Sequence, residues 1–115
     1  MRSALDRQRY ADRVIQLYRN TPGTLGYIRR ADRRLAADLH DRGVPLKTVE
    51  DAVLLASARR AFRSREAPPL APIATLHYFL PIIHELQVAP PEHGYLDYLR
   101  HKLATIASHN GHQIT

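Results

Sequence analysis

The sequence predicts an all-α protein, a small bundle of four to five helices with proline-rich connections. Apolar residues recur at three- and four-residue spacing in several segments, which is typical of helices that bury one face. No segment shows the alternation of apolar and polar residues that predicts a strand. The eight prolines and five glycines fall largely between the periodic segments, where they interrupt helices.

One domain is expected, because 115 residues suffice for a single hydrophobic core. Apolar residues make up 44% of the chain and charged residues 24%, values typical of a globular protein rather than a disordered one. We expect a single helical domain over residues 1–108, with a basic half at 1–66 and a neutral half at 67–108. Residues 109–115 are expected to form a flexible tail.

The first helix is expected at residues 3–18, with Ser3 as its N-cap, because apolar residues recur there at helical spacing. The sequence Asn-Thr-Pro-Gly at 20–23 ends it. The second helix is expected at residues 24–42, and Gly43 suits the position just after a helix C-terminus. Its predicted apolar stripe comprises Ile28, Ala31, Leu35 and Leu39.

The third helix is expected to start near Pro45 or Thr48 and to end near residue 62. It is apolar over more than one face, which predicts that it is the central helix of the bundle. Residues 67–72, Ala-Pro-Pro-Leu-Ala-Pro, cannot be helical throughout, because each proline lacks a donor and restricts the residue before it. An extended connection is therefore expected, with Leu70 and Ile73 as candidates for packing onto the core.

A fourth helical segment is expected at residues 75–87 and contains Pro81. Either one helix is kinked at this proline or two short helices meet there. A second pair of prolines, at 90 and 91, precedes the last helix, which is expected at residues 92–108.

Positive charge is concentrated in the first half of the chain and is carried by arginine. Residues 1–66 contain 15 Lys and Arg against 8 Asp and Glu, whereas residues 67–115 contain 2 against 3. Fourteen of the 15 arginines precede Glu66. Guanidinium groups bind phosphate through forked, bidentate contacts, so this asymmetry predicts a polyanion as the partner.

The densest basic cluster lies on the second predicted helix, where i,i+4 spacing places four arginines in two adjacent rows. A second cluster of arginines lies at the end of the third predicted helix. A third set lies on the first helix and comprises Arg7, Arg9, Arg13 and Arg19. Tyr27 precedes the first cluster and lies off the apolar stripe, so it is available to stack on a nucleic-acid base. The candidate nucleic-acid-binding residues are Tyr27, Arg29, Arg30, Arg33, Arg34, Arg59, Arg60 and Arg63.

Three interpretations of these arginines stay open. They can form a phosphate-binding surface with salt-sensitive affinity for DNA or RNA. They can instead form a solvated face with local ion pairs, or meet the acidic surface of a partner protein. The aspartates spaced to neutralise them are Asp12, Asp32, Asp38 and Asp41.

A helix-turn-helix is a further hypothesis, because apolar and glycine spacing around Gly43 approximates that motif. The helix that would read bases begins near Thr48, however, and presents Glu50 and Asp51 first, where a reading helix exposes Arg, Asn, Gln or Lys.

Other function classes lack a sequence signal. The chain has no cysteine, which excludes disulfides and thiolate nucleophiles. No phosphate-binding or dinucleotide-binding glycine motif and no nucleophile motif occurs, and the seven histidines lack metal-ligand spacing. We therefore expect no enzymatic activity, no cofactor and no metal; an enzyme would need a histidine and carboxylate pocket. The longest apolar runs are five residues, too short to span a bilayer, so we expect a cytoplasmic protein without a membrane partner.

Three features follow one another over residues 39–60. An amphipathic helix is followed by the sequence Arg-Gly-Val-Pro-Leu at 42–46 and then by the sequence Val-Glu-Asp-Ala-Val at 49–53. This arrangement resembles the helical domains of DnaD-type replication-initiation proteins and accessory proteins of bacterial mobile elements, over about a fifth of the chain. The short C-terminal motif by which DnaD-type domains engage DNA has no counterpart here, so the resemblance assigns no site residue. It implies a non-catalytic nucleic-acid-binding protein, an accessory factor in replication or of a mobile element. The alternative is a protein-interaction subunit of a larger nucleoprotein assembly.

Overall fold

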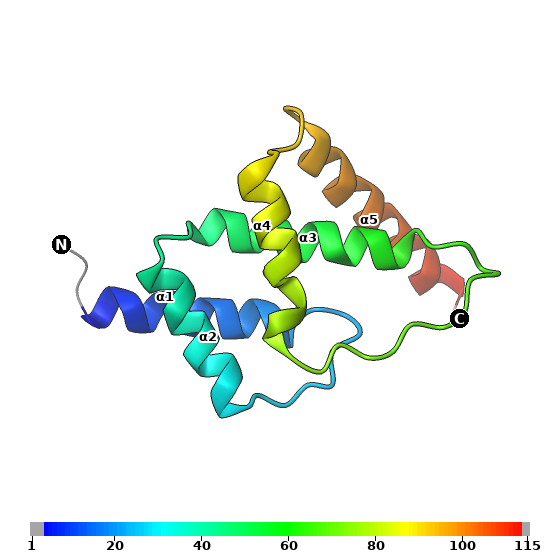
Figure 1. The fold of residues 1–115 in the computed structure, drawn as a ribbon. Coiled ribbons are helices and arrows are strands. Elements are labelled where there is room, and N and C mark those ends of the chain that lie inside the picture. The colour runs from blue at the N-terminus through cyan, green and yellow to red at the C-terminus, as the bar shows by residue number, and fades with distance from the viewer. Residues whose placement is uncertain (1–3, 114–115) are drawn as a thin grey trace.

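The computed structural model describes the backbone of residues 4–113 and the side chains of residues 4–106. Over this part of the chain the fold is all-α, as predicted, with five α-helices and one short 3₁₀ helix (Figure 1). The helices are α1 (Ala4–Arg19), α2 (Arg30–Asp41), α3 (Leu46–Ala61), η1 (Leu76–Phe79, 3₁₀), α4 (Leu80–Val88) and α5 (Tyr95–Gln113).

Helix α3 is the centre of the bundle, as its apolar sequence predicted. It packs against α1, α4, α5 and η1, while α2 packs against α1 and η1 (Figure 1). Only Lys47, Arg59 and Ala61 of α3 are exposed. This enclosure leaves α3 without a free face that could enter a DNA groove, so the structure does not support the helix-turn-helix hypothesis.

One hydrophobic core joins residues from both halves of the chain. Tyr18 of α1 and Phe79 of η1 are almost wholly buried and meet edge to face, with their ring centroids 6.2 Å apart. Ile73 is also buried, as expected, whereas Leu70 remains 44% exposed. The neutral half therefore completes the core beneath α1 and α2.

Helix α2 begins at Arg30, so its predicted start near residue 24 is wrong. Two backbone hydrogen bonds hold the preceding segment beside Ile73 instead: Leu25 N donates to Ile73 O at 3.1 Å, and Ile73 N donates to Gly23 O at 2.7 Å. Gly26 then has a φ of 91°, a left-handed conformation that favours glycine and cannot continue into a helix from Thr24. The tertiary pairing with Ile73 thus overrides the local helical pattern.

The buried face of α2 also differs from the predicted stripe, because Asp32 is fully buried while Ala31 is exposed. Asp32 Oδ2 accepts a hydrogen bond from Arg29 N at 2.9 Å. Its Oδ1 accepts from Leu76 N at 2.9 Å and from Thr75 Oγ1 at 3.0 Å. One carboxylate therefore caps the start of α2 and fastens it to the start of η1.

The ends of the later helices refine the sequence predictions. Two short helices meet near Pro81, which lies in the first turn of α4, where a missing N–H costs nothing. Helix α5 extends through residues 109–113, which were expected to form a tail. No proline follows residue 91, and Gly111 alone weakens a helix by only about 1 kcal/mol. Residues 114–115 and the predicted N-cap Ser3 lie outside the described residues.

Loss of the hydroxyl group is expected to change the free energy of unfolding in opposite directions at two tyrosines of α1. Tyr18 Oη is buried and has no hydrogen-bond partner among the described residues, whereas Tyr10 Oη donates to Val44 O at 2.8 Å. We expect Tyr18→Phe to raise the free energy of unfolding by up to about 1 kcal/mol and Tyr10→Phe to lower it by about 1 kcal/mol. Urea denaturation of both variants checks this, and a matching loss in both would contradict it.

Candidate nucleic-acid interface

Arg29, just before α2, and Arg30, Arg33 and Arg34 on the helix are all exposed, as the sequence predicted, but the three on the helix lie toward two sides. Arg33 faces α1, and Arg30 and Arg34 lie toward η1 and α4. Each side is hollowed into a groove that further basic residues line. We refer to them as the α1–α2 groove and the α2–η1 groove.

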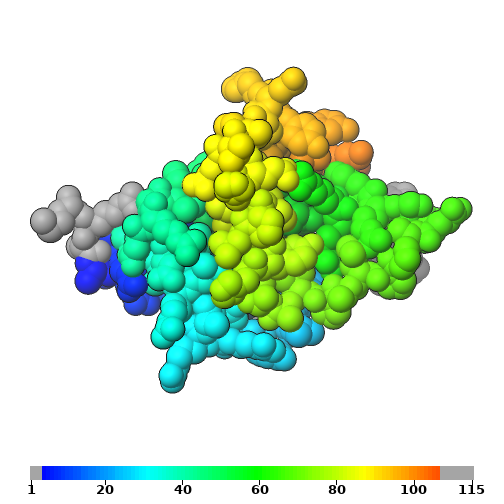
Figure 2. All heavy atoms as spheres, in the orientation of Figure 1, coloured from blue at the N-terminus to red at the C-terminus, as the bar shows by residue number. Residues whose placement is uncertain are grey.

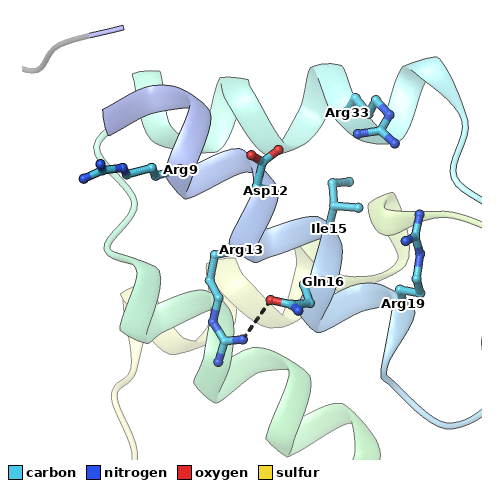
Figure 3. Close-up of a pocket in the computed structure, with 7 residues that line it drawn as sticks. All are labelled: Arg9, Asp12, Arg13, Ile15, Gln16, Arg19 and Arg33. Carbon is cyan, nitrogen blue, oxygen red and sulfur yellow. Dashed lines mark hydrogen bonds between the residues drawn. The ribbon is translucent and has the colours of Figure 1, made fainter. Parts of the chain in front are cut away.

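The α1–α2 groove has a volume of about 480 Å³. Three of its arginines come from α1 and one comes from α2, and Ile15 lies between them (Figure 3). Its single carboxylate, Asp12, accepts a hydrogen bond from Gln8 Nε2 at 2.8 Å. The groove is lined by Arg9, Asp12, Arg13, Ile15, Gln16, Arg19 and Arg33.

The α2–η1 groove has a volume of about 380 Å³. It lies where α2 meets the continuous segment formed by η1 and the start of α4. Figure 2 shows α2 and this segment side by side. Leu35 and Leu80 give it a partly apolar lining. Its charged and titratable residues are Arg30, Arg34, Asp38, Arg42 and His77.

The expected neutralising aspartates do not pair with the α2 cluster. Asp41 is held by Arg7, whose Nε and Nη2 donate to Oδ1 and Oδ2 at 3.0 and 3.1 Å. These hydrogen bonds from Arg7, with help from His40, hold the pKa of Asp41 below its ordinary value. Asp32 is buried in the core. Within residues 4–106, ion pairs involve only Arg7, His40, Lys47, Arg59 and Arg100 among the basic side chains.

Asp32 stays ionised although it is buried. Burial raises the pKa of this carboxyl group, but the hydrogen bonds from Arg29 N, Leu76 N and Thr75 Oγ1, together with nearby His77, outweigh burial and lower the pKa overall. The backbone N–H of Arg29 is therefore already occupied by this carboxylate.

The second predicted cluster, at the end of α3, lies apart from both grooves and is partly engaged. Arg59 binds Glu85 through two hydrogen bonds, and this contact raises the pKa of Arg59 and lowers that of Glu85. Arg60 Nη2 donates to Ala71 O at 3.2 Å, and its guanidinium lies 5.9 Å from the centroid of the Tyr78 ring. Arg63 lines a hollow formed with Arg60 and the proline-rich residues 67–70.

Arg60 also fixes the turn that follows α1. A Cβ atom added to Gly23, whose φ is 91°, would lie 3.0 Å from Arg60 Nη2, so glycine lets the guanidinium approach the backbone. The contacts of Arg60 thus join this turn, the proline-rich connection and η1. We assign Arg60 a structural role and leave it out of the interface.

Tyr27 is 57% exposed and precedes α2 on a non-helical segment. The guanidinium of Arg29 lies 5.5 Å from the centroid of its ring, at cation–π distance. The structure therefore keeps Tyr27 and Arg29 together.

Two parts of the interface fell outside the candidate list from the sequence. Arg9, Arg13 and Arg19 all lie on α1, but their spacing does not place them on one narrow face, and only the packing of α1 against α2 makes them line one groove with Arg33. Arg42 and His77 join Arg30 and Arg34 across elements far apart in the sequence, so spacing alone gives no signal for them.

No protein-family model matches this chain, and no curated protein or solved structure matches it either. The resemblance to DnaD-type domains therefore stays a prediction from the sequence. Among the side chains that the structure describes, no group of three or more His, Cys, Asp or Glu residues could hold a metal ion. No helix within residues 4–113 is both long and apolar enough to cross a membrane.

Proposed function

We propose that this protein binds DNA or RNA without catalysis, through phosphate contacts along both flanks of α2. One observation carries the proposal. Seven arginines line the two grooves around this helix, and within the described part of the chain none of them forms an ion pair. They are Arg9, Arg13, Arg19 and Arg33 in the α1–α2 groove and Arg30, Arg34 and Arg42 in the α2–η1 groove.

Unpaired guanidinium groups in adjacent grooves favour a chain of regularly spaced anions over a single small anion. Each groove contains only one carboxylate, so the positive potentials of the two grooves add over one surface. A nucleic-acid backbone supplies such a chain, and arginine binds its phosphates in bidentate fashion. The proposal places the protein in the cytoplasm, as an accessory factor in replication or of a mobile element.

A protein partner is the second candidate function, and exposed apolar residues favour it. Val88 at the end of α4 is 68% exposed, and Tyr95 and Tyr98 on α5 are 45% and 56% exposed. These residues belong to the neutral half of the chain, which carries few charges. Such a surface suits a subunit that joins a larger nucleoprotein assembly.

Fluorescence anisotropy over a range of salt concentrations tests the main proposal. Labelled single-stranded DNA, duplex DNA and single-stranded RNA are titrated with the protein, and polyglutamate serves as the control for an acidic protein surface. With four to seven phosphate contacts, we expect the slope of log K against log salt to lie between about −3 and −6. The absence of nucleic-acid binding at low salt, or equal affinity for polyglutamate, would contradict the proposal.

A further inference from the structure

Tyr27 lies on a segment that is anchored at both ends. At its start, Leu25 N donates to Ile73 O at 3.1 Å, next to an isolated bridge between Thr24 and Ile73. At its end, Arg29 N donates to the buried carboxylate of Asp32 at 2.9 Å. The backbone that presents Tyr27 is therefore fixed before any ligand arrives, which lowers the entropy cost of binding.

The two neighbouring side chains of this segment have different environments. Ile28 is partly buried and packs against the core, whereas Tyr27 is 57% exposed. The ring of Tyr27 thus contributes little to the core, although an aromatic ring has much apolar surface to bury. Tyr27 contacts Arg29 instead: Arg29 Nη2 donates to Tyr27 Oη at 3.5 Å, and the guanidinium lies 5.5 Å from the ring centroid.

This pair directly precedes the arginines of the proposed interface. Arg30 directly follows Arg29, and Arg33 lies three residues beyond Arg30, about 4.5 Å further along the axis of α2. A strand whose base rests on Tyr27 would therefore have guanidinium groups at hand for its adjoining phosphates. Aromatic rings and arginines combined in this way are typical of single-strand binding surfaces.

We propose that Tyr27 and Arg29 form a base-stacking platform and that the preferred ligand is single-stranded nucleic acid. This inference rests on the proposed function and adds the strand type to it. In a duplex, neighbouring bases cover each other's faces, so a ring can stack only on an unpaired base. Duplex nucleic acid would then contact the arginines alone and gain nothing from Tyr27.

The absence of tryptophan from the chain allows a direct test. Tyr27→Trp introduces a single reporter whose fluorescence is quenched when a base stacks on it. Tyr98→Trp is the matched control, because Tyr98 is 56% exposed and also lies beside a cation, with Lys102 Nζ 5.9 Å from its ring centroid. We expect oligothymidylate to quench the Tyr27→Trp reporter strongly and to leave the Tyr98→Trp reporter unchanged.

Two further probes separate stacking from charge: an abasic oligonucleotide of the same length, which keeps the phosphates without the bases, and a duplex. We expect neither to quench the Tyr27→Trp reporter. Tyr27→Ala should weaken binding of oligothymidylate by about 5-fold to 150-fold, a stacking energy of about 1 to 3 kcal/mol, and leave duplex affinity within about twofold.

The possible failures differ from one another. Equal affinity for the abasic strand and oligothymidylate, without quenching, would overturn the stacking platform and leave nucleic-acid binding intact. Equal quenching of both reporters would also overturn it, because bases would then contact position 98 as readily as position 27. Failure of every oligonucleotide to bind at low salt would overturn the proposed function and this inference together.

Discussion

Asp32→Ala is expected to lower the free energy of unfolding by about 3 to 5 kcal/mol, because it leaves one buried and two partly buried donors without an acceptor. The lost bonds are those from Arg29 N, Leu76 N and Thr75 Oγ1. For a domain of this size, the melting temperature should fall by about 10 to 20 °C. Thermal melting followed by circular dichroism measures the change.

Two control variants separate the hydrogen bonds from the charge. Asp32→Asn keeps one acceptor oxygen for Leu76 N and Thr75 Oγ1, so we expect a smaller loss than with Asp32→Ala. Asp97→Ala removes a carboxylate that is exposed and pairs with Arg100 on the same helix, so its effect should stay within about 0.5 kcal/mol. A melting temperature for Asp32→Ala close to that of Asp97→Ala would contradict the assigned role.

The same carboxylate makes stability depend on pH. Because the pKa of Asp32 is lower in the folded state than its ordinary value of 3.8, its contribution is fully present above pH 3.8. That contribution is lost as the pH falls through the folded pKa. Asp32→Asn should therefore lose less stability than the wild type on acidification below about pH 4.

The double variant Arg30→Glu with Arg33→Glu is expected to weaken nucleic-acid binding by about thirtyfold or more at moderate salt. The pair removes one guanidinium from each groove and adds a carboxylate to each. The slope of log K against log salt should become less steep by about two, since about two phosphate contacts are lost. The fold should persist, because both residues are exposed and glutamate near a helix N-terminus favours the helix dipole.

Arg100→Glu with Lys102→Glu is the matched control, because it changes the net charge by the same amount on α5, which packs against α3. We expect this control to retain most of the affinity, apart from a small effect of the lower net charge. Equal losses in the two double variants would mean that net charge alone attracts the nucleic acid. Unchanged affinity in Arg30→Glu with Arg33→Glu would remove α2 from the interface.

Local sequence patterns predicted most of the helices, because prolines and apolar spacing act within a few residues. The start of α2 was the main error, and its cause lies far along the chain: Ile73 holds residues 23–25 by backbone hydrogen bonds. Asp32 was expected to neutralise arginines and instead lies in the core. A charged residue on a helix gives no sign of burial until its donors, here Thr75 and Leu76, are known.

The candidate interface was predictable in part. The i,i+4 spacing correctly indicated that Arg30, Arg33 and Arg34 are exposed on one helix, whereas Arg29 is exposed but precedes that helix. Spacing could not show that Arg33 faces α1, or that Arg59 binds Glu85, because both contacts depend on tertiary packing. The number of arginines follows from the sequence, whereas their distribution between two grooves requires the fold.

Asp32 and residues 23–25 are attached to the neutral half of the chain. The charge of the candidate interface and its shape are therefore determined by different segments. Nearly all of its charge is encoded before residue 67, whereas the contacts that shape the Tyr27 segment and the first turn of α2 come from Ile73, Thr75 and Leu76. Substitutions in residues 73–76 can therefore alter the outline of the surface without changing its charge. The charge of this surface and its shape can thus change independently, because different segments of the chain determine them.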